Sequence, residues 1–178
     1  MKRNLLLYLV VCLLGAFSGV ADATIVQFDL GTEFSGATAP EGSGTWVQIS
    51  FRDTATPGSV LLTLTNTAIV KNEYVKGVYL NLRTEFALDD LSFASPQQVG
   101  SFGMPSISLS RDAYKADGDG YYDIFLSFAT QKKDRFGPDG SLSYIVSGPA
   151  GLSASSFDAM SAPSGGHGPY PAVAHVLG

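Results

Sequence analysis

A glycine-rich turn carrying several carboxylates is the segment of this sequence best suited to bind a ligand. Calcium in protein loops takes oxygen ligands from alternate positions of such a turn. Like charges gathered in a turn cost stability unless a cation or water separates them, and this makes calcium at residues 117–123 a possible interpretation. The predicted calcium ligands are three carboxylates at positions 1, 3 and 7 and one backbone carbonyl at position 5: Asp117, Asp119, Asp123 and Tyr121.

The same turn also has a simpler interpretation. An EF-hand loop requires Gly at position 6 and Glu at position 12, where this chain has Tyr122 and Phe128. An EF-hand is therefore excluded, and only a looser Asp-x-Asp-Gly loop is left. Asp-Gly occurs twice here, and it is the preferred type I′ turn between two antiparallel strands. A plain hairpin leading into residues 121–128 is thus the favoured interpretation, with calcium as the alternative.

Residues suited to catalysis are few. The two histidines, His167 and His175, both lie near the C-terminus, and no Gly-x-Ser-x-Gly motif accompanies them. The acidic residues Glu85, Asp89 and Asp90 offer paired carboxylates of the kind that glycoside hydrolysis needs. Adjacent acids in a loop are more often a solvated turn, so we expect no enzymatic activity, and a secreted hydrolase is only the second alternative.

Aromatic residues suggest a carbohydrate-binding module as the first alternative. Trp46, Tyr79 and Tyr121 fall on strand faces opposite the aliphatic residues. Exposed aromatic faces can stack on sugar rings, although in a two-sheet sandwich the same rings can instead pack under loops. Trp46 is the predicted ligand-binding residue, together with exposed tyrosines.

The sequence pattern predicts that the elements positioning these residues are β-strands. Apolar side chains alternate with a period of two in four segments, which predicts strands with one buried face. Weaker strand candidates are residues 24–30, 106–109, 142–146 and 172–177, the last at a sheet edge. The predicted buried faces are Val47, Ile49 and Phe51; Val60, Leu62 and Leu64; Val78, Leu80 and Leu82; and Tyr122, Ile124, Leu126 and Phe128.

Short strands separated by Gly/Pro turns predict an all-β fold, an antiparallel β-sandwich, with jelly-roll-like and immunoglobulin-like topologies both open. At most one short helix is expected, at residues 153–160, capped by Ser153 or Ser155 with Phe157 and Met160 inward. We expect one domain, residues 24–178, with a flexible Gly/Pro segment at 163–171.

The N-terminus predicts export. Lys2 and Arg3 precede an apolar run of about a dozen residues, and small residues end in Ala21-Asp22-Ala23. This is the pattern of a secretory signal peptide, residues 1–23, cleaved before Thr24. The run is shorter than the roughly 20 residues that a membrane-spanning helix needs, so no transmembrane helix is expected in the mature chain. A lipoprotein signal using Cys12 is disfavoured because no small residues precede that cysteine.

Net charge and cysteine content exclude some classes of partner and any disulfide in the mature chain. The 178 residues carry a formal net charge of −5, which argues against nucleic acid or an anionic bilayer as the main partner. Cys12 is the single cysteine, so the mature chain has no disulfide and relies on its hydrophobic core.

Several segments resemble a group of exported bacterial proteins that usually carry a PEP-CTERM sorting tail, and the similarity runs across residues 27–178. The resemblance implies a Gram-negative-type bacterium, export through the general secretory route, and a role at the cell surface or in extracellular polysaccharide, with no known enzymatic activity. The tail itself would follow the segment around His175. The sequence ends at Gly178, so either a piece is missing or this member is released. The segments are Phe34-Ser35-Gly36-Ala37, Trp46, Leu61-Leu62-Thr63-Leu64-Thr65-Asn66, Tyr79-Leu80-Asn81-Leu82, Tyr114-Lys115-Ala116-Asp117-Gly118-Asp119-Gly120-Tyr121-Tyr122-Asp123-Ile124, Ser155-Ser156-Phe157 and Ala174-His175-Val176.

The sequence therefore predicts a secreted or cell-surface, non-enzymatic protein associated with extracellular polysaccharide. Calcium at residues 117–123 is the predicted cofactor, and no other cofactor is expected.

Overall fold

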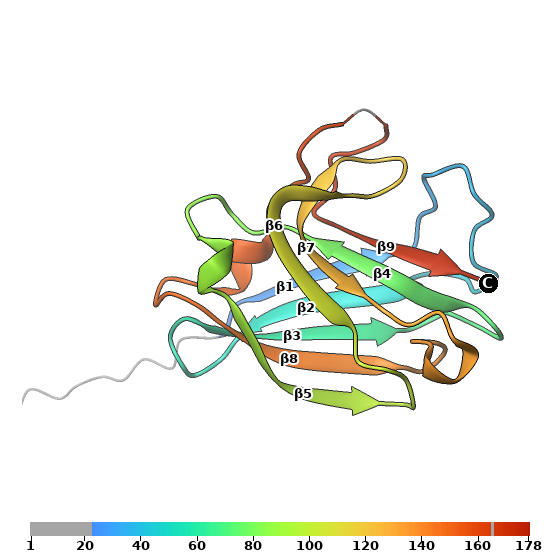
Figure 1. Cartoon of the computed structure of the whole chain (residues 1–178), viewed down its shortest axis with the longest axis horizontal. Helices are drawn as coiled ribbons and strands as arrows, with labels where there is room; N and C mark the ends of the chain where they lie inside the picture. Colours follow the sequence, from blue (N-terminus) through green and yellow to red (C-terminus); the bar gives the residue numbers. More distant parts are fainter. Residues whose placement is uncertain (1–22, 165) are drawn as a thin grey trace, which may run out of the picture.

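Two antiparallel sheets pack face to face in the computed structural model, which describes residues 23–164 and 166–178 (Figure 1). The predicted signal peptide falls almost wholly outside these residues. In the described part of the chain, the five-stranded sheet has the order β1 (Ile25–Leu30), β2 (Val47–Asp53), β3 (Ser59–Asn66), β8 (Ser141–Ser147), β5 (Ser92–Val99). The four-stranded sheet has the order β6 (Ser106–Lys115), β7 (Tyr121–Ser127), β4 (Tyr74–Leu80), β9 (Ala172–Leu177). The predicted all-β sandwich is confirmed.

The chain passes repeatedly from one sheet to the other. Strand β3 pairs with β8 in the first sheet, while β4, which directly follows β3, pairs with β7 in the second. Strands β6 and β7 form the predicted hairpin, in which the Ala116 N–H donates to the Gly120 carbonyl. Strand β9 lies beside β4 at the edge of its sheet, as predicted.

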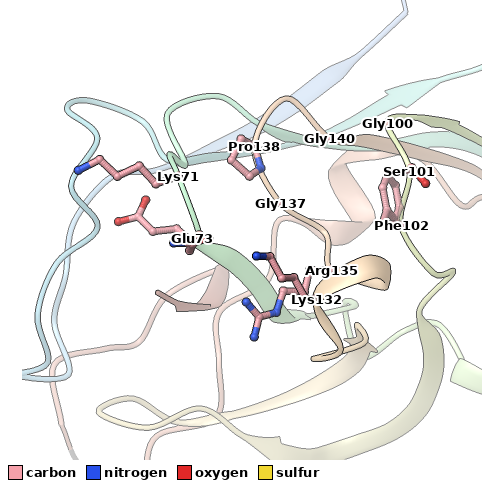
Figure 2. A pocket seen from close by; sticks show the side chains of 11 residues that line it. Lys71, Glu73, Gly100, Ser101, Phe102, Lys132, Arg135, Gly137, Pro138 and Gly140 are labelled. Atoms are coloured by element: carbon pink, nitrogen blue, oxygen red, sulfur yellow. The ribbon is translucent and has the colours of Figure 1, made fainter.

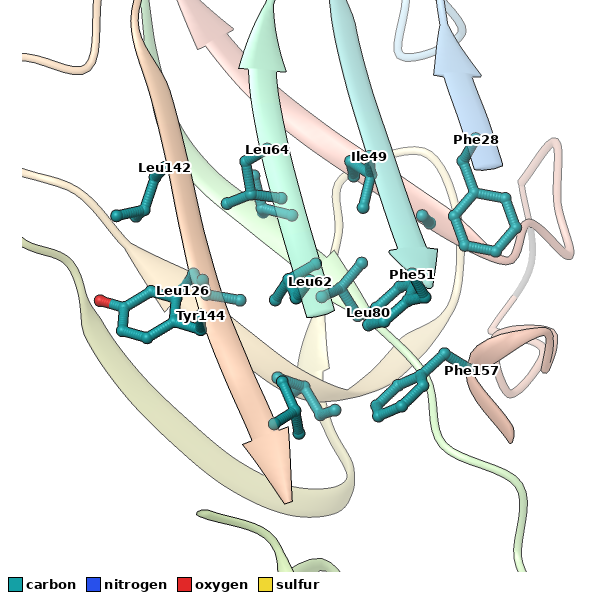
Figure 3. Close-up of a cluster of buried hydrophobic side chains, with 14 of the residues drawn as sticks. Phe28, Ile49, Phe51, Leu62, Leu64, Leu80, Leu126, Leu142, Tyr144 and Phe157 are labelled. Carbon is teal, nitrogen blue, oxygen red and sulfur yellow. The ribbon is translucent and has the colours of Figure 1, made fainter. Parts of the chain in front are cut away.

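The main core lies between the two sheets and contains the apolar faces that the alternation predicts, with one exception. Tyr122 is fully buried, as predicted, but lies in a second, smaller apolar cluster. Leu62 and Leu64 of β3 face Leu80 of β4 and Leu126 of β7 across the sandwich (Figure 3). These side chains are buried, and each contributes about 1.5–3 kcal/mol relative to an exposed position.

The predicted short helix is smaller than expected. A 3₁₀ turn, η3 (Ala154–Phe157), begins with a capping box between Ser153 and Ser156. Phe157 is buried and stacks on Phe51 with ring centroids 4.1 Å apart. Met160 is 59% exposed, so the prediction that it points inward is wrong. The turn ends at Phe157, so Met160 lies outside it and the helical spacing that would place its side chain inward does not apply.

The remaining helical turns in the described residues are also short, η1 (Leu88–Asp90) and η2 (Lys132–Asp134). None of the helices described has the length and apolar character needed to cross a membrane.

Candidate functional site

The Asp119 carboxylate in the glycine-rich turn is buried and held by two hydroxyl groups. Asp119 is 3% exposed, and its Oδ2 accepts hydrogen bonds from the Tyr122 hydroxyl and, at 2.9 Å, from Ser161 Oγ. Burial, followed by the hydrogen bond to Asp119, raises the pKa of Tyr122, so this hydroxyl stays protonated and donates. Gly168 covers the other oxygen, since a Cβ there would lie 1.5 Å from Asp119 Oδ1. Asp119 thus ties the β6–β7 hairpin to the segment around Ser161.

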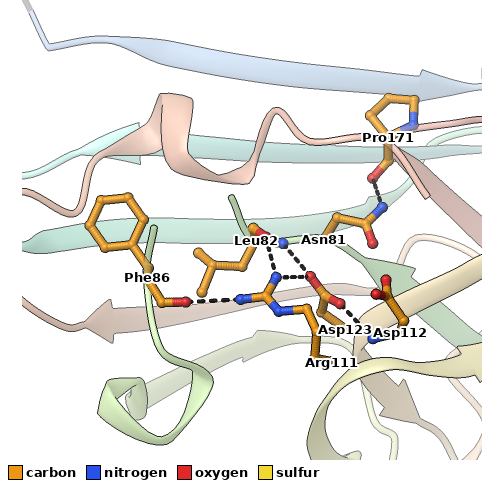
Figure 4. Close-up of polar contacts among 7 residues, drawn as sticks. All are labelled: Asn81, Leu82, Phe86, Arg111, Asp112, Asp123 and Pro171. Atoms are coloured by element: carbon orange, nitrogen blue, oxygen red, sulfur yellow. Dashed lines mark hydrogen bonds and ion pairs between the residues drawn. The ribbon is translucent and has the colours of Figure 1, made fainter. Parts of the chain in front are cut away.

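The Asp123 carboxylate serves a different set of partners (Figure 4). It is 2% exposed and forms an ion pair with Arg111, with 2.5 Å between Nη1 and Oδ2. It also accepts hydrogen bonds from the backbone N–H groups of Leu82 and Asp112, at 3.1 and 2.9 Å. Arg111 in turn donates to the carbonyls of Leu82 and Phe86. This group joins β6 and β7 to the segment that follows β4.

The structure does not bring the predicted calcium ligands together. The Tyr121 carbonyl accepts a hydrogen bond from the Ala162 N–H at 2.9 Å, and the Asp117 side chain is exposed. Residues 23–164 and 166–178 contain no group of three or more His, Cys, Asp or Glu side chains placed to hold a metal ion. Calcium at this turn stays a prediction without a coordinating cluster to support it.

The acidic residues considered for glycoside hydrolysis are also separated. Glu85 lines an open pocket of about 270 Å³, together with Arg83 and Asp158. Asp89 and Asp90 lie in the exposed turn η1 and do not line this pocket. The structure therefore does not place Glu85 and Asp89 on either side of a common cleft.

Trp46 and the outward-facing tyrosines, such as Tyr79, do not lie on one common surface. Its indole Nε1 donates to the Gly42 carbonyl at 2.6 Å, and its ring packs against the main hydrophobic core. Tyr79 belongs to a second apolar cluster around Tyr122. The prediction that Trp46 and exposed tyrosines form one stacking platform is therefore not supported by their positions.

The structure instead places a row of aromatic rings on the outer face of the four-stranded sheet. Across this face, Phe125 of β7 pairs in register with Tyr79 of β4, and their rings stack with centroids 4.6 Å apart. Tyr114 of β6 stacks on the other side of Phe125, at 5.7 Å. All three rings are half-buried, so each keeps part of its surface open to solvent. We call Tyr79, Phe125 and Tyr114 the aromatic row.

A row of small and polar residues lies next to the aromatic row. Gly77 of β4 pairs with Ser127 of β7 on one side and with His175 of β9 on the other. The Phe125 ring leans over Gly77, where a Cβ would lie 2.7 Å from Phe125 Cε2. Ser106 of β6 continues this row beyond Ser127. The absence of a side chain at Gly77 thus lets an aromatic ring lie close to the sheet beside two hydroxyls and an imidazole.

Burial is the main cause that keeps the His175 imidazole and the Tyr79 hydroxyl of this face neutral near pH 7. Burial and then Lys76 lower the pKa of His175, while Asp117 opposes them. A neutral imidazole can both donate and accept a hydrogen bond. Burial and then Asp117 raise the pKa of Tyr79, so its hydroxyl stays protonated.

One signal in the sequence could have located this face. An isolated glycine inside a strand pattern indicates close approach of another group, and Gly77 lies two residues before the outward-facing Tyr79. Tyr114 and Phe125 meet only through strand pairing between β6 and β7, which the residue pattern of a single strand does not reveal.

No family model, curated protein or solved structure matches the chain.

Proposed function

We propose that this chain is an exported, non-enzymatic protein that binds extracellular polysaccharide through the outer face of β6, β7, β4 and β9. The observation that carries the proposal is the aromatic row, in which Tyr79, Phe125 and Tyr114 stack side by side and stay partly exposed. The signal-peptide pattern and the resemblance to exported surface proteins supply the cellular setting of the proposal.

The chemistry of this face suits a sugar chain. The C–H face of a pyranose ring is apolar and packs against an aromatic ring, while the sugar hydroxyls need hydrogen-bonding partners at the edge. Ser127 and His175 lie in the neighbouring row and can supply donors and acceptors. A shallow face of this kind accommodates a polymer lying across it, because a polymer does not need a closed cavity.

The proposal is tested by retention on immobilised polysaccharides, with a panel of neutral and acidic polymers. Tyr79→Ala and Phe125→Ala each remove one ring of the aromatic row, and we expect each to weaken retention about tenfold or more. This corresponds to about 1.4 kcal/mol, within the range of a lost aromatic contact.

Trp46→Phe is the matched control, because it changes an aromatic residue that lies away from the aromatic row. We expect it to leave retention unchanged. Thermal melting of each variant separates loss of binding from loss of folding. Wild-type retention by folded Tyr79→Ala and Phe125→Ala variants would contradict the proposal.

A further inference from the structure

A basic pocket lies beside the beginning of β4, at the end of the same sheet (Figure 2). Its volume is about 240 Å³. Segments around residues 71–73, 100–102 and 132–140 form it. The charged and aromatic side chains that line it are Lys71, Glu73, Phe102, Lys132 and Arg135.

Arg135 is held in a fixed orientation. Its Cζ lies 4.0 Å from the ring centroid of Tyr74, and its Nε donates to the Thr130 carbonyl at 2.8 Å. Tyr74 is only 7% exposed, so the guanidinium lies over a ring that the protein otherwise covers. A guanidinium stacked on a ring and anchored through Nε has lost much of its rotational freedom before a ligand arrives.

Glu73, the acidic residue that lines this pocket, is already engaged, and so is Lys71. Glu73 accepts hydrogen bonds from the backbone N–H groups of Glu41 and Val70 through its two carboxylate oxygens. Lys71 forms an ion pair with Glu41. Among the described residues, none of the ion pairs involves Arg135 or Lys132. Two cations in an acidic chain are thus left available to an external anion.

The stacked arginine continues the face that carries the aromatic row. Along β4, Val75 and Val78 belong to the core cluster, whereas Tyr74 and Tyr79 do not. The strand has a bulge between Val75 and Gly77, which brings Tyr74 onto the outer side with Gly77 and Tyr79. At about 3.3 Å per residue, Tyr74 and Tyr79 are roughly 16 Å apart. A polymer lying along β4 can therefore contact both the aromatic row and Arg135.

We propose that Arg135, assisted by Lys132, binds the carboxylate of an acidic sugar residue in the polysaccharide that lies on the aromatic row. This inference rests on the proposed function and adds the class of polymer, a uronic-acid-containing chain. Arginine binds a carboxylate through two parallel N–H···O bonds, a geometry that a lysine ammonium does not reproduce.

Polygalacturonate, its methyl ester and neutral dextran are the probes that test this inference, with dextran sulfate as a second anion. The wild-type protein should bind polygalacturonate at least tenfold more tightly than the methyl ester, and the difference should shrink as salt is added. Arg135→Gln should abolish this preference and leave binding to the methyl ester unchanged. Arg135→Lys keeps the charge but loses the planar fork, and should recover only part of the preference.

Lys71→Gln is the control, because Lys71 lines the same pocket but is paired with Glu41. It should keep the preference for polygalacturonate. Melting temperatures verify that each variant is folded.

The outcomes separate the two proposals. Equal binding of polygalacturonate and its methyl ester by the wild type, both weakened by Tyr79→Ala, overturns the carboxylate site and leaves the proposed function in place. Loss of all polymer binding in Arg135→Gln, with Tyr79→Ala unaffected, overturns the role of the aromatic row. A preference for dextran sulfate over polygalacturonate that Arg135→Gln removes overturns the assignment to a carboxylate.

Discussion

Two buried carboxylates hold the β6–β7 hairpin against the rest of the molecule. Asp119 accepts hydrogen bonds from Tyr122 and Ser161, and Asp123 forms its ion pair with Arg111. A buried carboxylate is stable only when it is paired or hydrogen-bonded, and each of these two has such partners. Both residues therefore stabilise the fold. They hold in place β6 and β7, the strands that carry Tyr114 and Phe125 of the aromatic row.

Replacing Asp119 should reveal this structural role. Asp119→Ala leaves the hydroxyls of Tyr122 and Ser161 buried without their acceptor, at a cost of about 1–3 kcal/mol for each group. For a chain of this size we expect the melting temperature to fall by about 4–24 °C. The fall should be the same in excess calcium and in EDTA, because Asp119 acts through hydroxyl groups.

The exposed Asp117 provides the comparison for this experiment. Asp117→Ala should melt like the wild type in both buffers. A rise of the wild-type melting temperature in calcium that Asp119→Ala abolishes would instead support a metal site at the turn.

Whole strands were predictable from the sequence where one face packs on the core. The period of two located β2, β3, β4 and β7, because each of these strands buries one row of side chains between the sheets. Strand β5 was not predicted. It pairs only with β8 at the sheet edge and exposes most of its residues, so core packing imposes no alternation on it.

The candidate site was only partly predictable, for a related reason. The outward position of Tyr79 follows from the alternation of its own strand. The contacts of Phe125 with Tyr114 and of Arg135 with Tyr74 depend on how separate segments pair. Trp46 was predicted at the site from its residue type and its place on the face opposite the aliphatic residues. Its hydrogen bond to the Gly42 carbonyl holds it against the neighbouring loop instead.

Strand β5 is an edge whose shape should protect it from pairing with another molecule. Ser95 has a φ of 52°, and the register with β8 shifts between Ala94 and Gln97. Pro96 lies within this bulge and has no N–H to offer. Bulges and prolines at an edge interrupt the regular ladder that a second chain would extend.

Deleting Pro96 should turn this edge into a continuous strand. The deletion removes both the extra residue and the proline, so Ala94 and Gln97 would pair with Ile145 and Ser143 without a shift. We expect concentration-dependent dimers or larger species in sedimentation velocity, whereas the wild type should not self-associate through this edge. Gln98→Thr, on the same strand with the bulge intact, is the control. A monomeric deletion variant at high concentration would argue against this role of the bulge.

At the scale of the whole molecule, the two sheets share the main hydrophobic core. The main cluster combines side chains from both sheets, and β3 pairs with β8 across a long separation, with Thr65 opposite Ser141. A sheet separated from its partner would expose its entire apolar face to water, which is strongly unfavourable. The two sheets should therefore fold and unfold together, although slowly, because most pairings join distant parts of the chain.

One buried charge in either sheet should then unfold the whole chain. Leu64→Asp in β3 and Ile124→Asp in β7 each place an unpaired carboxylate in the shared core. We expect both variants to lose the near-ultraviolet circular dichroism of the native state and retention on polysaccharide. Thr63→Asp, on the half-exposed opposite face of β3, should melt close to the wild type. Calorimetry of the wild type should show one transition with equal calorimetric and van't Hoff enthalpies. If the Ile124→Asp protein instead kept one thermal transition and lost another, the five-stranded sheet would be stable alone. The aromatic row could then be lost without unfolding the rest of the molecule.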